Sequence, residues 1–210
     1  MISTNVKNIV FDDISLAFDS PIFISLSTEF KANSFNILVG QSGSGKSSIL
    51  KLILGLLTPQ SGNIFISDVK LNADSINLLR NSMSWIPNSD LKFPNLLIST
   101  FLTNLAIDFN LFEKNLLKFR LNTEILSKNF SEISSGEKQR FFISVADYFD
   151  RDYLVCDEIS SSLDAENKDI VIEFLKNSNK TIICATHDND LISIADNIYR
   201  IENKGIINGL

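Results

Sequence analysis

The stretch Gly40-Gln41-Ser42-Gly43-Ser44-Gly45-Lys46-Ser47 fits the pattern of a phosphate-binding loop, in which glycine and four further residues precede Gly-Lys-Ser. The apolar residues 35–39 before it indicate a short buried strand, and residues 48–54 after it indicate a helix. In that context, successive backbone N–H groups point at phosphate oxygens and the helix N-terminus adds its dipole. The pattern predicts a nucleoside triphosphate site that extends from Gly40 to Ser48.

Two acidic residues end a second apolar run, residues 153–158, and they complete this prediction. In open α/β sheets, ligands bind at the carboxyl ends of the strands, where Asp157 and Glu158 would lie. Lys46 would contact the β- and γ-phosphates, and the Ser47 hydroxyl would bind Mg²⁺. Asp157 would hold the same ion through its water shell, and Glu158 would face the attacking water. The alternative interpretation is a solvated loop after a strand.

Bulk properties exclude several classes of protein. A chain of 210 residues can form one core with a subdomain, and a net charge of −6 provides no basic surface for nucleic acid. The longest apolar stretch, residues 49–57, is far shorter than the roughly 20 residues that span a bilayer. Residues 1–5 lack the pattern of a secretory signal, so we expect a cytoplasmic protein. We expect Cys156 and Cys184 to be small apolar core residues.

The order of the patterned segments predicts an α/β fold with two additions. Residues 5–39 are rich in strand-forming residues, with turn signals at residues 12–13, 19–21 and 31–33, and they predict a small antiparallel sheet. We expect the helix after Lys46 to stop at the breaker cluster of residues 58–62, before strands near residues 63–66 and 83–87. Apolar residues at helical spacing over residues 96–130 predict an inserted helical subdomain, about residues 89–140 of a single domain.

Several single residues have competing interpretations. The pattern around Phe18 favours core packing. Ser134 and Glu137 form a capping box, which predicts a capped helix start and also an anion site. Asp164 could be only an N-cap. His187 is the only histidine and follows a predicted strand, residues 180–186, where it could contact a phosphate or water. Residues 198–207 predict a closing hairpin.

Taken together, these features resemble the ATP-binding subunits of ABC transporters over essentially the whole chain. Residues 40–47 resemble the Walker A motif, residues 133–140 the signature LSGGEKQR, and residues 154–158 the Walker B motif with its catalytic glutamate. Residues 162–164 resemble the D-loop, His187 the switch histidine, and Asn88 stands at the position of the Q-loop glutamine. The resemblance implies a P-loop NTPase core with a mainly parallel sheet, an N-terminal antiparallel β-subdomain and an inserted α-helical subdomain.

The resemblance also implies a mechanism that needs two subunits. ATP bound to Walker A of one subunit would be covered by Ser134, Ser135 and Gly136 of the other, with Asp164 close by. Phe18 would stack on adenine. Glu158 would orient the attacking water near His187, while Lys46 and Mg²⁺ offset the phosphate charge. The chain would be the ATPase of a transporter that drives a separate membrane permease, located in the cytoplasm at the inner face of the membrane.

Two departures from the family pattern bear on activity. Asn88 is one methylene shorter than glutamine, which weakens a direct contact with Mg²⁺. Ser135 replaces the first signature glycine and adds a side chain where backbone approaches phosphate. Residues 79–80, 85–87, 100–101 and 104–105 are similar to exporter-type ATPases. Two other interpretations stay open: a soluble ABC-type ATPase that regulates a protein complex, and a weakly hydrolytic partner in a heterodimer. The sequence leaves open the cargo and the choice between homodimer and heterodimer.

Overall fold

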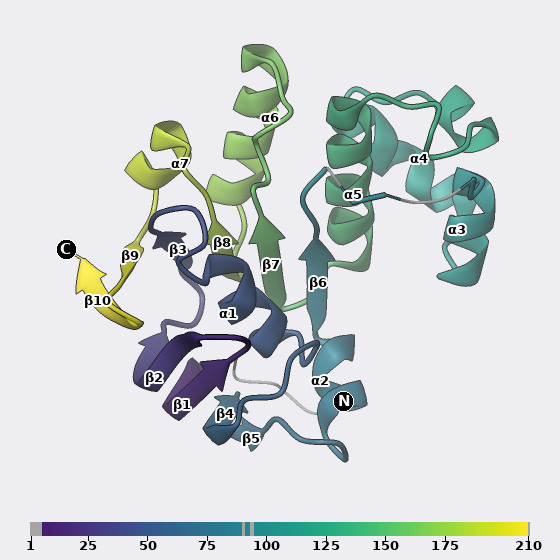
Figure 1. Cartoon of the computed structure of the whole chain (residues 1–210). Coiled ribbons are helices and arrows are strands. Elements are labelled where there is room, and N and C mark those ends of the chain that lie inside the picture. Colours follow the sequence, from purple (N-terminus) through teal and green to yellow (C-terminus); the bar gives the residue numbers. More distant parts are fainter. Residues whose placement is uncertain (1–5, 90, 93–94, 210) are drawn as a thin grey trace. The chain divides into compact units, whose positions relative to one another are not determined.

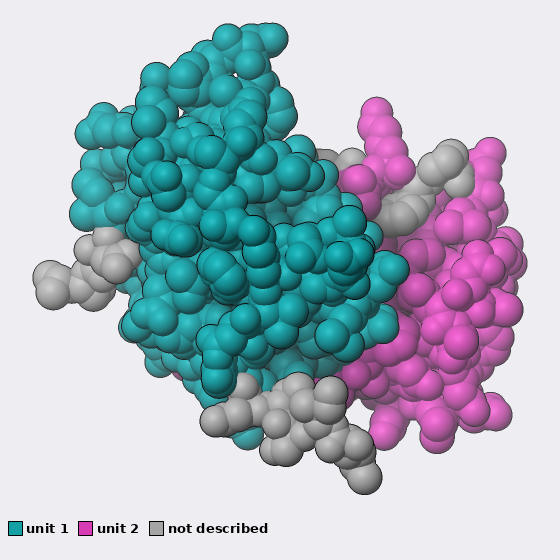
Figure 2. All heavy atoms as spheres, turned by 90° about the horizontal axis from the view of Figure 1, so that it is seen from below, with its two compact units in different colours: residues 1–85, 151–157, 178–210 teal, residues 86–150, 158–177 magenta. Residues whose placement is uncertain are grey.

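The structure is a computed structural model that describes residues 6–89, 91–92 and 95–209 (Figure 1). The chain divides into two compact units, which Figure 2 colours separately: unit 1 comprises residues 1–85, 151–157 and 178–210, and unit 2 comprises residues 86–150 and 158–177. Residues 1–5, from which we expected no secretory signal, lie outside the described part, as do residues 90 and 93–94 of the expected helical subdomain. The single domain with a subdomain at about residues 89–140 stays a prediction.

Unit 1 contains an antiparallel sheet, as expected for its N-terminal residues. Its strand order is β2-β1-β4-β5, with bounds β1 Ile9–Ala17, β2 Pro21–Phe30, β4 Ser61–Ile66 and β5 Val69–Lys70. The turn predicted at residues 12–13 is wrong, because both residues lie inside β1. Asp13 has φ 54° and the register of β1 shifts between Phe11 and Ile14, so these acids mark a bulge and not a strand end.

A second, mainly parallel sheet confirms the α/β class. Its strand order is β10-β9-β3-β8-β7-β6. The bounds are β3 Phe35–Val39, β6 Met83–Ile86, β7 Tyr153–Asp157, β8 Thr181–Ala185, β9 Asn197–Glu202 and β10 Gly205–Gly209. Strand β3 runs parallel to β8 and β9, and β7 runs parallel to β8, whereas β9 and β10 form the predicted hairpin. All five residues of β8 are buried, as expected for a strand covered on both faces.

The helices of unit 1 are α1 Lys46–Ile53, α2 Ile76–Asn81 and α7 Asn189–Ser193. The expectation that α1 continues to residues 58–62 is wrong. Gly55 has φ 62°, its N–H donates to the Leu52 carbonyl at 3.0 Å, and the Leu56 N–H donates to the Lys51 carbonyl at 2.8 Å. This is a Schellman ending, and the apolar residues after Gly55 concealed it in the sequence.

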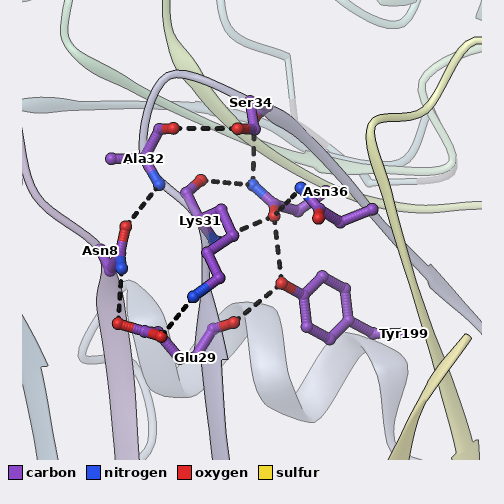
Figure 3. Close-up of polar contacts among 8 residues, drawn as sticks. Asn8, Glu29, Lys31, Ala32, Ser34, Asn36 and Tyr199 are labelled. Carbon is purple, nitrogen blue, oxygen red and sulfur yellow. Dashed lines mark hydrogen bonds and ion pairs between the residues drawn. The ribbon is translucent and has the colours of Figure 1, made fainter. Parts of the chain in front are cut away.

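Asn36, at the start of β3, is fully buried and joins several segments of unit 1 (Figure 3). Its Nδ2 donates to the carbonyls of Lys31 at 2.9 Å, Ser34 at 3.0 Å and Ile182 at 3.1 Å. Its Oδ1 accepts from the Lys31 N–H at 3.1 Å and the Tyr199 hydroxyl at 3.3 Å. A single side chain thus satisfies buried polar groups from β8, β9 and the turn before β3.

Unit 2 is helical in the segment where the sequence predicts helices. It contains α3 Ile98–Asn104, α4 Phe109–Lys118, the 3₁₀ helix η1 Thr123–Ser127, α5 Ser135–Phe149 and α6 Ala165–Lys176. Phenylalanine rings pack together in this unit: the buried Phe130 stacks on the buried Phe142 at 5.8 Å and makes a T-shaped contact with the partly exposed Phe101 at 5.3 Å. Within the residues that the structure describes, no helix is both long enough and apolar enough to cross a bilayer.

Candidate functional site

The phosphate loop lies between β3 and α1, as predicted. A Cβ at Gly40 would lie 2.7 Å from the Ser44 Oγ and 2.9 Å from the Ile201 carbonyl, so only glycine fits there. Gly45, the residue before α1, has φ 105°, a conformation that side chains disfavour. Residues 41–43 are exposed. The loop is therefore shaped by glycine and open on one side to a ligand.

Lys46, the first residue of α1, is 8% exposed and its amine points back at the loop. The Nζ donates to the carbonyls of Gly40 at 2.8 Å and Gln41 at 3.1 Å. These bonds hold a positive charge beside the backbone of the loop. The amine is thus placed where the sequence predicts a phosphate contact.

Ser47 and Asp157 meet beside this loop. The Ser47 Oγ donates to the Asp157 Oδ1 at 3.3 Å, which joins the start of α1 to the end of β7. Burial raises the pKa of Asp157, although the Ser47 hydrogen bond and the charges of Lys51 and Lys46 act in the opposite direction. A partly buried carboxylate beside a hydroxyl is suited to a cation, because the positive ion stabilises the ionised carboxylate where burial has removed part of its hydration.

The Ser47 hydroxyl and the Asp157 carboxylate are oxygen ligands of the type that Mg²⁺ prefers. Among the described residues, no three His, Cys, Asp or Glu side chains form a cluster that could hold a metal. Mg²⁺ is commonly held by one or two carboxylates together with substrate phosphates and water. Cys156, the residue before Asp157, is fully buried beside Cys184, so both cysteines are core residues as expected.

His187 shares a cavity of about 910 Å³ with the phosphate loop. The lining residues come from the loop, from the region of α7 and from β9 with the turn after it, and are Val39, Gly40, Gln41, Ser44, His187, Asn189, Ile192, Ile198, Arg200, Ile201, Glu202 and Asn203. The Ser44 hydroxyl is buried and has no hydrogen-bond partner in the structure. The sequence predicted that His187 contacts a phosphate or water, and this contact stays a prediction. The contribution of the C-terminal hairpin to the cavity had no sequence signal beyond its turn.

Phe18 is 62% exposed, so the interpretation as a core residue is wrong. It follows β1, immediately before the bend at Asp19 and Ser20, where the chain leaves the sheet. Its N–H donates to the Ser20 carbonyl at 3.2 Å. An aromatic ring that is not packed in the core is available to stack on a planar ligand, the role that the family resemblance implies.

In unit 2, the predicted capping box is present at the start of α5. The Glu137 N–H donates to the Ser134 Oγ at 3.2 Å, and the Ser134 N–H donates to the Glu137 Oε2 at 2.9 Å. The hydrogen bonds from the Ser134 N–H and hydroxyl lower the pKa of Glu137. Ser135 is exposed and Gly136 is partly exposed in the first turn. Helix N–H groups and the helix dipole favour an anion here.

The segment between β7 and α6 packs against this helix start. A Cβ on Gly136 would lie 2.9 Å from the Ser162 carbonyl oxygen, so the two backbones touch. Asp164 is the N-cap of α6, because its Oδ1 accepts from the Asn167 N–H at 2.9 Å. The capping interpretation of Asp164 is therefore confirmed, and its role toward a nucleotide stays a prediction.

Glu158 has φ 52°, an uncommon conformation for a residue with a side chain. Its carbonyl accepts from the N–H of Ser161 at 3.2 Å and from the Ser161 hydroxyl at 3.0 Å, which close a tight turn directly after Asp157. Asn88 follows β6 at its carboxyl end, as predicted.

The predicted site residues thus fall into two sets. Phe18, the phosphate loop, Asp157 and His187 belong to unit 1, and Asn88, Ser134 to Gly136, Glu158 and Asp164 belong to unit 2.

Comparisons with known proteins agree with these features. A family model described as "ABC transporter" matches residues 24–161. The chain is 30% identical over 196 residues to the probable iron export ATP-binding protein FetA of Escherichia coli (strain K12), covering 89% of this chain and 87% of that protein. It is 29% identical to the energy-coupling factor transporter ATP-binding protein EcfA1 of Mycoplasmopsis synoviae (strain 53), covering 86% of this chain and 72% of that protein.

Solved structures show the same fold. The ATP-binding cassette MJ0796, in a dimeric post-hydrolysis state bound to ADP and Pi, has a TM-score of 0.83 at 18% identity and covers 96% of this chain and 97% of its own. A bacterial Atm1-family ABC exporter with ATP bound has a TM-score of 0.86 at 22% identity over 98% of this chain. This chain spans only 38% of the exporter's length.

Proposed function

This chain belongs to the ABC transporter family, as one of its ATP-binding subunits, and from that premise we propose that it hydrolyses ATP in a site shared with a second ATPase subunit. The single observation that carries the proposal is that the predicted phosphate-binding features belong to two different compact units of the chain. Unit 1 holds the phosphate loop with Lys46 and the Ser47–Asp157 pair. Unit 2 holds a capped helix start at Ser134. Each is one half of a site that a second subunit would complete.

ATP binds, in this proposal, through residues 40–48, with Lys46 on the β- and γ-phosphates and the exposed Phe18 ring on adenine. Ser134, Ser135, Gly136 and Asp164 of one subunit cover the ATP held by the other. The second subunit is either an identical copy or a heterodimer partner. This arrangement gives the helix dipole of α5 an anion at its N-terminus.

Mg²⁺ fits the Ser47 hydroxyl and the Asp157 carboxylate, with Asn88 as a more distant or water-mediated ligand. The bound ion would supply charge neutralisation on the β- and γ-phosphate oxygens. For the hydrolytic step, Glu158 orients the attacking water, His187 contacts the γ-phosphate, and Lys46 offsets the developing charge. Ser135 and Asn88 set a lower rate than the family residues would.

The energy of hydrolysis drives a separate integral-membrane permease, which holds the chain in the cytoplasm at the inner face of the membrane. The relatives named for iron export and for an energy-coupling factor transporter support a transport role. The similarity of residues 79–105 to exporter-type ATPases favours export. A net charge of −6 argues against a nucleic-acid partner.

The proposal is tested by ATP binding and by trapping. Purified protein should bind ATP in a calorimetric titration, Lys46→Ala should abolish that binding, and Glu158→Gln should stop hydrolysis and produce an ATP-dependent dimer in analytical ultracentrifugation. Glu166→Gln is the matched control, because Glu166 is an exposed acid of unit 2 whose partner is Arg120. A protein that binds no ATP, or a Glu158→Gln variant that hydrolyses ATP at the parent rate, would refute the proposal.

The transport role has its own test, which also separates it from a soluble regulator. Tagged protein purified from detergent-solubilised membranes should bring with it a protein that has several membrane spans. Recovery of the tagged chain only with soluble proteins would favour the regulatory alternative.

A further inference from the structure

Ser89 lies in the loop after β6 and is only 3% exposed. Its hydroxyl forms a hydrogen bond with the Ser162 hydroxyl, in the segment between β7 and α6. Ser89 Oγ also lies 3.5 Å from the Asn88 Oδ1, a long contact in which the amide oxygen can only accept. Because each hydroxyl has one hydrogen, Ser162 donates to Ser89 when Ser89 donates to Asn88. The bonds then run in one direction, from Ser162 through Ser89 to Asn88.

Ser162 contacts a second element through its backbone. Its carbonyl oxygen lies 2.9 Å from the position of a Cβ on Gly136, which is close enough that alanine at 136 would force a shift. Gly136 is the second residue of α5, in the turn that the capping box stabilises. One residue therefore joins the loop that carries Asn88 to the first turn of α5.

We propose that Ser89 and Ser162 are positioning residues, whose shared hydroxyl hydrogen bond fixes the Ser162 carbonyl against Gly136 and so sets how the start of α5 is presented to the ATP of a second subunit. Neither hydroxyl touches nucleotide in this scheme. The inference rests on the proposed function, since it concerns the half of the site that unit 2 contributes. It assigns control of subunit pairing to a contact between two residues that are 73 positions apart in the sequence.

The link predicts a specific pattern of effects. Loss of either hydroxyl frees the Ser162 segment, so the ATP-bound dimer becomes weaker while the phosphate loop in unit 1 keeps its own geometry. A net hydrogen bond of ordinary strength corresponds to about a threefold to tenfold change in the dimer dissociation constant. Removal of both hydroxyls should have no larger effect than removal of one, because either removal breaks the same bond.

The experiment compares Ser89→Ala, Ser162→Ala and the double variant in the Glu158→Gln background with ATP. Sedimentation equilibrium gives the dimer dissociation constant, calorimetry gives the affinity of the subunit for ATP, and thermal unfolding without nucleotide gives stability. Ser144→Ala is the matched control, since Ser144 is a fully buried serine of unit 2 whose hydroxyl donates to the Arg140 carbonyl within α5. Ser162→Thr keeps a hydroxyl and should restore pairing.

The outcomes fall into three groups. Weaker dimers with unchanged ATP affinity, no further loss in the double variant and recovery with threonine support the inference. Dimers as strong as those of Ser144→Ala, additive losses, or lower thermal stability with unchanged pairing overturn it and leave a purely structural contact. If the Glu158→Gln parent itself binds no ATP or does not dimerise, the proposed function is refuted at that earlier step. The inference, which rests on it, is then refuted as well.

Discussion

The Ser47 hydroxyl lies 3.3 Å from the Asp157 carboxylate, so the first turn of α1 and the last residue of β7 meet at one point. Burial raises the pKa of this carboxyl group. Without a cation, the ionised form of Asp157 is therefore less stable in the folded protein than in the unfolded chain. The same carboxylate that suits a metal ion destabilises the ion-free protein.

Asp157→Asn should raise the melting temperature of the nucleotide-free protein at neutral pH. A carboxyl group whose pKa is raised in the folded state holds its proton more tightly there, so stability falls as the pH rises from the ordinary carboxyl range, about 3.9, through the raised pKa. Asparagine does not ionise, so the variant does not lose this stability. The difference in melting temperature between variant and parent should vanish below pH ~3.9, where Asp157 is protonated in both states. Calorimetric scans across this range, without Mg²⁺ or ATP, measure it. A variant that melts lower at neutral pH contradicts the prediction.

Phe18→Ala should reduce affinity for ATP without destabilising the fold. Stacking of a base on an aromatic ring contributes about 1–3 kcal/mol, whereas an exposed surface substitution changes stability by about 0.5 kcal/mol or less. Binding of inorganic triphosphate, which has no base, should be unchanged. Titrations of both ligands measure the effect, with Ile24→Ala, another exposed apolar residue of unit 1, as control. Equal losses for ATP and triphosphate would show that Phe18 acts on the loop and not on adenine.

Asn36→Ala should destabilise the protein by about 2–3 kcal/mol, because buried backbone groups lose their partners. The carbonyl of Ile182 and the Tyr199 hydroxyl are among those that bond to Asn36. Urea unfolding measures the free energy, with Asn81→Ala, an exposed residue at the end of α2, as control. Equal stability of the two variants would mean that water replaces the amide at no cost.

Ser135→Gly should raise the turnover of ATP by about threefold to tenfold, the effect of one improved hydrogen bond to phosphate. Glycine lets the backbone at the start of α5 approach more closely, since it lacks a Cβ. Steady-state hydrolysis measures the gain, and Ser99→Gly, in the first turn of α3, should show none. Unchanged turnover would mean that Ser135 is not what limits the rate. Asn88→Gln tests the second departure in the same assay.

The sequence contained enough local information for the phosphate loop, the strands around it, the capping box and the helices of unit 2. Each of these depends on residues within one short window, such as Ser134 and Glu137. Window-based patterns misled in three places. Hydrophobicity alone made Phe18 a core residue, apolar residues after Gly55 hid the end of α1, and two acids in β1 made a bulge look like a turn.

Long-range polar contacts could not be predicted in the same way. The Asn36 amide bonds to groups 146 and 163 residues away, and Ser89 meets Ser162 across 73 residues. For an asparagine inside an apolar strand, or a serine in a loop, the neighbouring sequence does not identify a hydrogen-bond partner that lies far away along the chain. These contacts depend on which strands lie next to each other in the sheet. A pattern within one short segment of sequence carries no information about that order.

The Lys46 amine donates hydrogen bonds to the Gly40 and Gln41 carbonyls of its own loop. An ammonium group has three N–H donors, so these two bonds can persist when a phosphate oxygen binds to the same amine. The loop backbone thus fixes the direction of the Lys46 side chain before a nucleotide arrives, and less conformational freedom is lost on binding. A variant that loosens residues 40–41 would therefore weaken ATP binding even though Lys46 itself is unchanged.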